Sequence, residues 1–159
     1  MKNKSIAEQL TFGKISNITT YQAGIMQATM NRALQKEYDT VLKPYGITKM
    51  HWLIIGTVLD AGRGGIRLTE LSQVINTTMS YVTTAVNLME SKGMIVRTDS
   101  EFDSRSKMIS INESFAPKCA EIEASLRDSL RKTIYAKIDS AEFKIYMKVM
   151  HQLSSSTQE

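Results

Sequence analysis

The stretch that decides the fold consists of four short segments, which read LTELSQVIN (68–76), TTMSYVTTAVNLMESKG (77–93), MIVR (94–97) and KMISI (107–111). The first two segments carry apolar residues at helical spacing. Thr69 is placed to cap the first helix, and Thr77 or Thr78 to cap the second. Gly93 ends the second helix where a residue with positive φ is usually needed. The last two segments lie on either side of a polar loop and predict a β-hairpin.

Each of the two helices has a side that we expect to face a core. The expected inner residues are Leu71, Val74 and Ile75 on the first helix, and Val82, Ala85, Val86 and Met89 on the second. Two short helices with a tight turn near Asn76, followed by a β-hairpin, make a winged helix-turn-helix. Such a unit lays its second helix in the DNA major groove and its wing beside the backbone or in the minor groove.

Two helices are predicted ahead of this stretch. Apolar residues step by three and four from about Asn17 to Leu42, which predicts a long amphipathic helix that ends at Pro44 and Gly46. Residues 1–15 have no firm pattern and are expected to form an arm. A second helix should begin after a Thr48 cap, and its expected inner residues are Trp52, Ile55, Val58 and Leu59.

Two more helices are predicted after the wing. The apolar repeat from Phe115 to Ile138 predicts one helix of roughly six turns. Asp139 or Ser140 should start a last helix, whose apolar stripe is Phe143, Met147, Met150 and Leu153. Three long striped helices cannot easily cover all their apolar faces within one chain, so pairing with a second copy is expected.

Size and composition are those of one ordinary globular domain. The chain has 159 residues, of which 42% are hydrophobic and 23% charged. No apolar run approaches the length of a membrane span and no signal-peptide core is visible, so a cytoplasmic protein without membrane contact is expected. The net charge is +4, but residues 64–112 carry five basic and five acidic side chains. The case for DNA therefore rests on the motif and not on the charge.

The stretch from Ile47 to Ile111 resembles the winged-helix core of the MarR family of bacterial transcription regulators. Ile47-Thr48, Trp52, Ile55 and Leu59 fall where that family has its LT…W…L…L helix. Residues 90–95, which read ESKGMI, resemble its helix end E-(small)-K-G-L-(I/V). The wing pattern D-x-R-x-K is matched by Asp103, Arg105 and Lys107.

The resemblance implies a mainly α fold with a small β wing, in which long terminal helices dimerise. Residues 1–46 would then form an N-terminal arm and dimerisation helix, residues 47–112 the DNA-binding region, and residues 113–159 the C-terminal dimerisation helices, all within one structural domain. A homodimer would present two recognition helices to the two halves of a pseudo-palindromic site on double-stranded DNA. A repressor is the expected role.

The residues expected to contact DNA on the recognition helix are uncharged. Its outward side carries Ser80, Tyr81, Thr83, Thr84 and Asn87, whose hydroxyls and amide suit phosphates and base edges. Asparagine suits a bidentate contact to adenine. Residues 79–88 include no charged side chain, whereas the family often has arginines near two of these positions. We therefore expect readout by amide, hydroxyl and methyl contacts or by DNA shape; the alternative is a solvated polar face.

The wing is expected to carry the electrostatic part of DNA binding. Arg105 at its tip suits a narrow minor groove, and Asp103 is spaced to pair with Arg105 or Arg97. Arg97 and Lys107, at the bases of the two strands, are expected to reach phosphates. The alternative is a solvated loop of mixed charge, because Asp99 and nearby acidic residues dilute the charge.

The family resemblance also implies an effector site where the dimerisation helices meet the winged helix, often for a small aromatic anion. Residues that can line such a pocket here are Tyr21, Met26, Met30, His51 and Trp52. The alternative is that Met26, Met30 and Trp52 are simply core. His51 itself is expected on a helix surface.

Other chemistry finds little support in the sequence. The two histidines, His51 and His151, have no partners at metal-ligand spacing, so no metal is expected. Cys119 falls in an apolar stripe and is interpreted as a buried structural thiol, with a thiol redox switch as the alternative. No catalytic set or cofactor fingerprint is visible, so neither enzymatic activity nor a cofactor is expected. A further alternative is a regulator of the same fold that binds DNA weakly and acts through protein contacts, because the recognition helix is uncharged.

Overall fold

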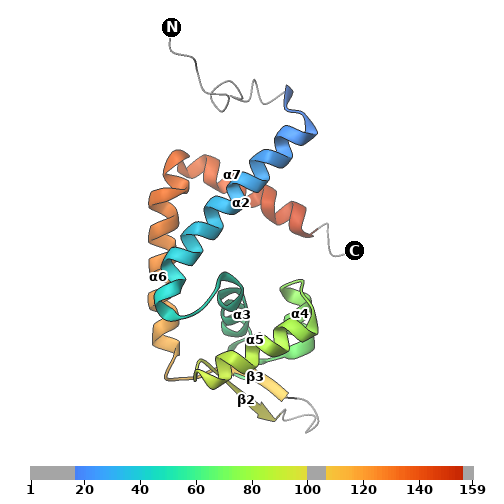
Figure 1. Cartoon of the computed structure of the whole chain (residues 1–159), viewed down its shortest axis with the longest axis vertical. Helices are drawn as coiled ribbons and strands as arrows, with labels where there is room; N and C mark the ends of the chain where they lie inside the picture. Colours follow the sequence, from blue (N-terminus) through green and yellow to red (C-terminus); the bar gives the residue numbers. More distant parts are fainter. Residues whose placement is uncertain (1–16, 100–106, 156–159) are drawn as a thin grey trace. The chain divides into compact units, whose positions relative to one another are not determined.

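The computed structural model describes residues 17–99 and 107–155 (Figure 1). The chain divides into two compact units, Met1–Lys36 and Glu37–Glu159. The predicted arm at residues 1–15 lies outside the described residues, as do Asp103 and Arg105. Mainly helical structure with a small sheet confirms the predicted fold class.

The first described helix, α2 (Thr20–Leu42), begins in the first unit and ends in the second. Its start is set by Thr19, whose backbone N–H donates to Gln22 Oε1 at 2.9 Å, so the helix begins three residues later than Asn17. A short 3₁₀ turn, η2 (Lys43–Tyr45), follows, and Gly46 ends it in the left-handed region at φ 66°. The predicted stop at Pro44 and Gly46 is confirmed.

The helix α3 (Lys49–Asp60) begins at the predicted Thr48 cap. Trp52, Ile55 and Val58 are buried as predicted. Leu59 is wrongly predicted as an inner residue, because it lies in the last turn of α3 and lines an open groove beside the sheet. His51 is also wrongly predicted, since its side chain is not on the surface but only 9% exposed.

The helix-turn-helix consists of α4 (Leu68–Val74) and α5 (Met79–Ser91). Thr69 does not cap α4: the chain enters the helix at Arg67, whose backbone N–H donates to Glu70 Oε2 at 3.1 Å. Val74 was expected inside but is 58% exposed, because α4 ends there and the chain turns through Asn76 at φ 49°.

The second motif helix follows the prediction closely. Thr78 caps α5, with Oγ1 accepting from the backbone N–H of Tyr81 at 3.3 Å. Its predicted inner residues, Val82, Ala85, Val86 and Met89, are all buried. Gly93 follows the helix at φ 70°, as expected.

The wing strands are β2 (Ile95–Asp99) and β3 (Lys107–Ile111), which pair antiparallel from Ile95↔Ile111 to Asp99↔Lys107. The structure adds a third strand, β1 (Ile66–Arg67), which pairs with β3 and gives the order β1-β3-β2. Its two residues are too few for any alternation to show in the sequence. Gly65 sits at φ 69° just before β1, where a Cβ atom would lie 2.6 Å from the carbonyl oxygen of Ile109.

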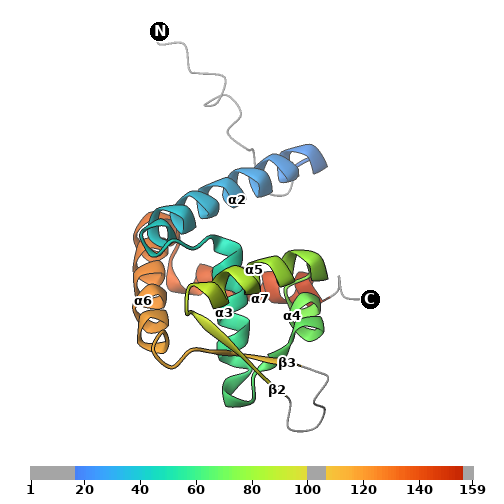
Figure 2. The same ribbon diagram turned by 60° about the horizontal axis from the view of Figure 1, so that its bottom comes forward.

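Figure 2 shows α3, α4 and α5 gathered on one side of the sheet, with α6 (Ala116–Thr133) beside them. The core between these elements is built from buried side chains of α3, α5, β2, β3 and α6, among them Ile54, Val82, Ile95, Ile109 and Ile122. This core fixes the direction in which α5 presents its outer face.

The predicted helix from Phe115 to Ile138 is too long. Helix α6 ends at Thr133, a 3₁₀ turn η4 (Tyr135–Lys137) follows, and Ile138 is extended. The Tyr135 ring packs edge-on against Phe143 with centroids 4.8 Å apart, a contact that a straight helix does not allow. The last helix, α7 (Ser140–Ser155), is capped by Asp139, whose Oδ1 accepts from the backbone N–H groups of Ala141 and Glu142 at 2.8 Å each.

Candidate nucleic-acid interface

The outer side of α5 is the part of the winged helix-turn-helix that can enter a groove. Ser80, Tyr81, Thr84 and Asn87 are exposed, and Thr83 is half-buried at the edge of the helix. The Thr83 hydroxyl donates to the carbonyl oxygen of Met79 at 2.8 Å, and the Thr84 hydroxyl donates to that of Ser80 at 3.0 Å. Both threonines therefore use their hydroxyl hydrogens inside the helix.

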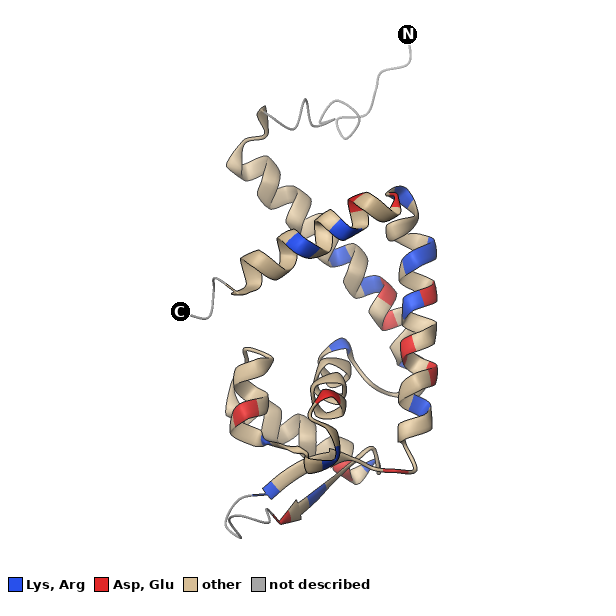
Figure 3. Cartoon of the chain, turned by 180° about the vertical axis from the view of Figure 1, so that it is seen from behind, with Lys and Arg blue, Asp and Glu red and all other residues tan. Residues whose placement is uncertain are grey.

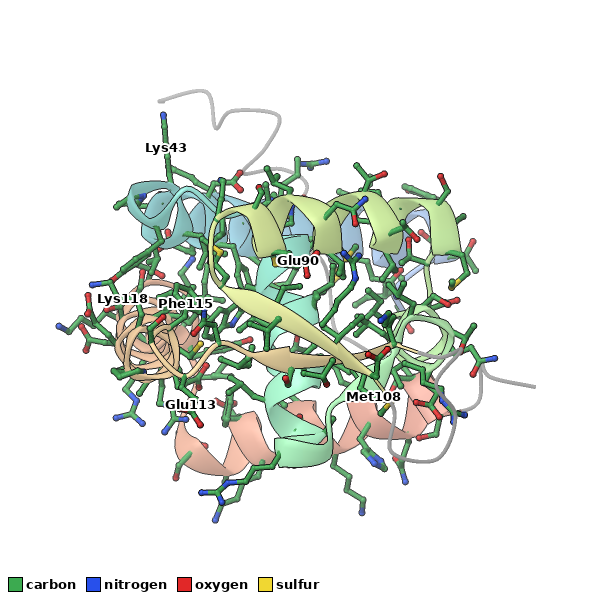
Figure 4. All side chains as sticks on the ribbon, turned by 90° about the horizontal axis from the view of Figure 1, so that it is seen from below. Lys43, Glu90, Met108, Glu113, Phe115 and Lys118 are labelled. Atoms are coloured by element: carbon green, nitrogen blue, oxygen red, sulfur yellow. The ribbon has the colours of Figure 1, made fainter. Side chains whose placement is uncertain are left out.

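Arg97 on β2 joins the recognition helix to the wing. Its Nη2 donates to Asn87 Oδ1 at 2.6 Å, and its Nη1 forms an ion pair with Glu90. Figure 4 shows Glu90 between the ribbons of α5 and β2. The Arg97 side chain is only 21% exposed. In this structure the guanidinium therefore holds α5, although the sequence predicts it as a phosphate contact.

The base of the wing carries a cross-strand pair of opposite charges. Lys107 forms an ion pair with Asp99, its register partner on β2. Both side chains are more than half exposed, so the pair contributes little to stability and the lysine can leave it for a phosphate. Figure 3 shows both signs of charge on these strands. The predicted contacts of Asp103 and Arg105 lie outside the described residues.

Lys92, just after α5, is used inside the protein. Its Nζ donates to the carbonyl oxygen of Gly46 at 2.8 Å. The same cation faces His51, whose Nδ1 accepts from the backbone N–H of Thr48 at 3.2 Å. Burial, and secondarily the Lys92 charge, hold the pKa of His51 below its usual 6.5. His51 is therefore a neutral part of the α3 cap.

A cavity of ≈580 Å³ lies in the second unit, between α3, α6, η4, α7 and the end of α2. Aromatic side chains of Tyr38, Trp52, Tyr135 and Phe143 line it. Of the predicted pocket residues, Trp52 lines this cavity and His51 does not. The other three, Tyr21, Met26 and Met30, lie in the first unit, where Tyr21 and Met26 are exposed. The cavity therefore has a largely different lining from the expected one.

The polar lining of the cavity includes both signs of charge. Arg127 is paired with Glu123 at 2.8 Å. Arg131 also lines the cavity and, among the residues that the structure describes, has no ion-pair partner. Burial, and then the Glu123 charge, raise the pKa of Tyr38. Its hydroxyl therefore stays protonated at neutral pH and can donate a hydrogen bond.

Cys119 lies in the core, where burial raises the pKa of its thiol. A raised pKa disfavours the reactive thiolate. Within residues 17–99 and 107–155, no three His, Cys, Asp or Glu side chains gather into a metal-binding group. No helix in the same residues is long and apolar enough to cross a bilayer.

Sequence comparison links this region to transcription regulators. Residues 45–106 match the MarR family, which confirms the resemblance over the segment from η2 into the wing. The HTH-type transcriptional regulator PrsX of Escherichia coli is 30% identical over 81 residues, which cover 51% of this chain and 49% of PrsX. The chain thus spans about half the length of the curated relatives that it matches.

Solved structures extend the likeness to most of the chain. A MarR family transcriptional regulator from Streptomyces coelicolor, in complex with DNA, has a TM-score of 0.77 at 17% identity and covers 89% of this chain and 91% of its own. The S. aureus MepR–DNA complex has a TM-score of 0.71 at 19% identity, with 87% and 99% covered. CouR from Rhodococcus jostii RHA1, bound to p-coumaroyl-CoA, has a TM-score of 0.73 at 14% identity, with 82% and 90% covered. At these identities the likeness shows the fold.

Proposed function

We propose that this chain, whose winged-helix region is that of the MarR family, is a transcription regulator that binds double-stranded DNA. One observation carries the proposal: Arg97 ties α5, with its exposed outer side, to the wing strand β2. A helix and a wing held together in this way can approach a duplex as one rigid DNA-binding unit. The DNA complexes of the S. coelicolor regulator and of MepR support the proposal.

The regulator would act as a homodimer. On α7, Ile145 and Leu153 are 63% and 64% exposed, and Met147, Val149 and Met150 are also exposed. In the other unit, the first half of α2 exposes Tyr21 and Ile25. Complete burial of one such side chain contributes about 1.5–3 kcal/mol, so a second copy of the chain that covers these faces would be strongly bound. The termini, residues 1–46 and 113–159, would supply this interface.

A two-fold dimer presents two copies of α5 to two half-sites, so the operator would be pseudo-palindromic. Occupying an operator with a compact dimer blocks access to a promoter, which makes repression the proposed outcome. The wing residues Arg105 and Lys107 would add phosphate or minor-groove contacts, while Asp103 would hold the wing tip.

The cavity supports control by a small aromatic anion. Arg131, which has no ion-pair partner in the described part of the chain, supplies a cation for a carboxylate, while Trp52 and Phe143 supply apolar walls for a ring. The Tyr38 hydroxyl supplies a donor for a phenol oxygen. The p-coumaroyl-CoA bound to CouR carries an aromatic ring, which supports an aromatic ligand. A ligand bound between α3 and the α6–α7 corner would change the spacing between the winged helix-turn-helix units of the two protomers. The dimer would then release DNA.

The test is binding of the purified chain to DNA from its own promoter region and to a scrambled duplex, across a series of salt concentrations. We expect the affinity for the promoter duplex to exceed that for the scrambled duplex by about a hundredfold or more, which lies within the usual ratio of specific to non-specific binding. The affinity should fall steeply as the salt concentration rises. Arg105→Ala is expected to remove much of the affinity. Failure of both duplexes to bind at low salt would overturn the proposal.

That failure would favour the alternative of a regulator that acts through protein contacts. The exposed apolar residues Met79, Tyr81 and Leu88 on α5 are the observation that supports it. A DNA-binding helix and a protein-binding helix differ in their salt dependence, because only the former releases condensed counterions from DNA. The salt series therefore separates the two functions.

A further inference from the structure

Arg97 fixes the orientation of the Asn87 side chain. An arginine has only hydrogen-bond donors, so the amide oxygen of Asn87, and not its nitrogen, must face the guanidinium. The contact from Arg97 Nη2 to Asn87 Oδ1 is 2.6 Å long and is charge-assisted. Glu90, one turn further along α5, holds the other guanidinium nitrogen, Nη1. The amide nitrogen of Asn87 therefore points away from β2, on the exposed side of α5.

This arrangement changes which bases Asn87 can read. A bidentate contact to adenine needs the amide oxygen to accept from the N6 amino group. In this chain a cation already uses that oxygen and lies beside it, so a second donor is disfavoured there. The free amide N–H₂ instead favours base atoms that accept, which in the major groove are O4 of thymine, O6 or N7 of guanine, and N7 of adenine.

The neighbours of Asn87 distinguish thymine from the two purines. Thr84, one turn before Asn87, donates its hydroxyl hydrogen to the carbonyl oxygen of Ser80, so it offers a base its methyl group and an oxygen that can only accept. Leu88 is 42% exposed beside it. Apolar groups suit the C5-methyl of thymine, and neither guanine nor adenine has a methyl group for them to contact. Over its whole length, Met79–Ser91, α5 has no arginine or lysine that could contact guanine.

From these contacts we infer that Asn87, positioned by Arg97, is a specificity-determining residue that reads thymine, with its amide donor on O4 and with Thr84 and Leu88 against the C5-methyl. The inference rests on the proposed DNA binding and names the base that the recognition helix selects. Arg97 acts as a positioning residue, because it sets the amide and does not itself need to touch a base.

The test begins with duplexes selected from a random library by the wild-type protein. In the selected sequence, each thymine is replaced in turn by uracil, which lacks only the methyl, and by 5-methylcytosine paired with guanine. The 5-methylcytosine keeps the methyl but has an amino donor in place of the O4 acceptor. Both replacements at one position per half-site should lower affinity by about fivefold to tenfold, within the usual cost of one changed base pair. Replacements at the other thymines serve as the matched control.

Two variants test the roles of the side chains. Asn87→Asp keeps an acceptor for Arg97 but replaces the amino donor with a second acceptor, so it should switch the preferred base from thymine to cytosine, whose N4 amino group donates. Arg97→Gln removes the cation beside the amide, so it should relax the preference and admit adenine. A change in base identity separates this role from a structural one, which would lower affinity for all duplexes alike. Circular dichroism checks that both variants fold.

The outcomes are distinct from those that test DNA binding itself. If no duplex is selected, DNA binding fails and the thymine contact fails with it. If a duplex is selected but uracil and 5-methylcytosine bind as well as thymine at every position, DNA binding stands and the thymine contact is overturned. An Asn87→Asp variant with unchanged base preference would also overturn it.

Discussion

Thr48 and His51 cap α3 reciprocally: the backbone N–H of Thr48 donates to His51 Nδ1 at 3.2 Å, and that of His51 donates to Thr48 Oγ1 at 3.3 Å. The usual partner of a threonine in such a capping box is glutamate or glutamine. A histidine does the same work only while Nδ1 is unprotonated, because the protonated ring has no acceptor. The cap of α3 therefore depends on pH.

We expect the stability of the protein to fall as pH drops below 6.5. Burial, and then the Lys92 charge, hold the pKa of His51 below 6.5 in the folded state, so the unfolded chain takes up a proton first. The contribution is fully present above pH 6.5 and is lost as pH falls towards the folded pKa. Urea unfolding at a series of pH values between 7.5 and 5 measures it.

The variant His51→Gln keeps an acceptor for the backbone N–H of Thr48, and its amide side chain does not titrate. This variant should stay within about 1 kcal/mol of the wild type at pH 7.5, the usual scale of a cap, and should lose part of the slope below pH 6.5. His151→Gln, at an exposed position of α7, is the matched control and should keep the slope. An unchanged slope in His51→Gln would show that other groups titrate.

Gly65 is expected to tolerate no side chain. A Cβ atom would lie 2.6 Å from the Ile109 carbonyl oxygen, and the backbone has φ 69°. Gly65→Ala should therefore destabilise the fold by about 2–3 kcal/mol, the combined scale of backbone strain and a steric clash. At Gly64, an added Cβ atom would have no described atom within 4 Å apart from those of its chain neighbours. Gly64→Ala should therefore change stability by less than about 1 kcal/mol. Thermal melts of the two variants decide, and equal melting temperatures would contradict the expectation.

The sequence predicts α5 well because its signals are local. Thr78, the buried apolar positions and Gly93 all act within one helix and its ends, so spacing alone identifies them. The elements that depend on contacts distant in sequence are different. Strand β1 exists because Ile66 pairs with Ile109, and η4 because Tyr135 packs on Phe143. Neither contact produces a periodic pattern of apolar residues in the sequence.

The candidate site shows the same division. Spacing identified the outer side of α5, including Asn87, because it lies opposite the buried side of the helix. The sequence does not predict the Arg97–Asn87 contact, because the pattern assigns Arg97 to a phosphate or to Asp103 and gives no sign that β2 lies beside Asn87. The order Glu90, Gly93, Arg97 could have predicted the ion pair, because the glycine ends the helix that carries the glutamate and the arginine lies on the strand that follows. The cavity lined by Arg131 needs the bend at η4, which the sequence did not predict.

The exposed side of α7 is expected to hold a dimer together. Ile145→Glu places a charge on a face that a second copy would cover, and burying an unpaired charge is costly. The dissociation constant of the dimer should rise at least about tenfold, which corresponds to about 1.4 kcal/mol. Sedimentation velocity over a range of protein concentrations measures it. Lys144→Glu is the control, because this exposed residue precedes Ile145 and is turned about 100° away from it around the same helix. An equal effect in both variants would argue against this face.

The cavity at the α6–α7 corner is expected to bind a small aromatic carboxylate. Arg131 lines it with no ion-pair partner among the described residues, so a carboxylate placed there gains a charged hydrogen bond that no internal group already satisfies. Calorimetric titration with a hydroxycinnamate should give binding that Arg131→Gln weakens by about tenfold, the scale of a charged hydrogen bond.

Lys132→Gln, one residue along α6 and paired with Asp128, removes the same charge outside the cavity lining and should leave binding unchanged. The phenol analogue without the carboxylate should bind both variants equally, since only the carboxylate needs Arg131. If Arg131→Gln and Lys132→Gln weaken hydroxycinnamate binding to the same degree, the anion responds to the net charge of α6, and the cavity is not its site.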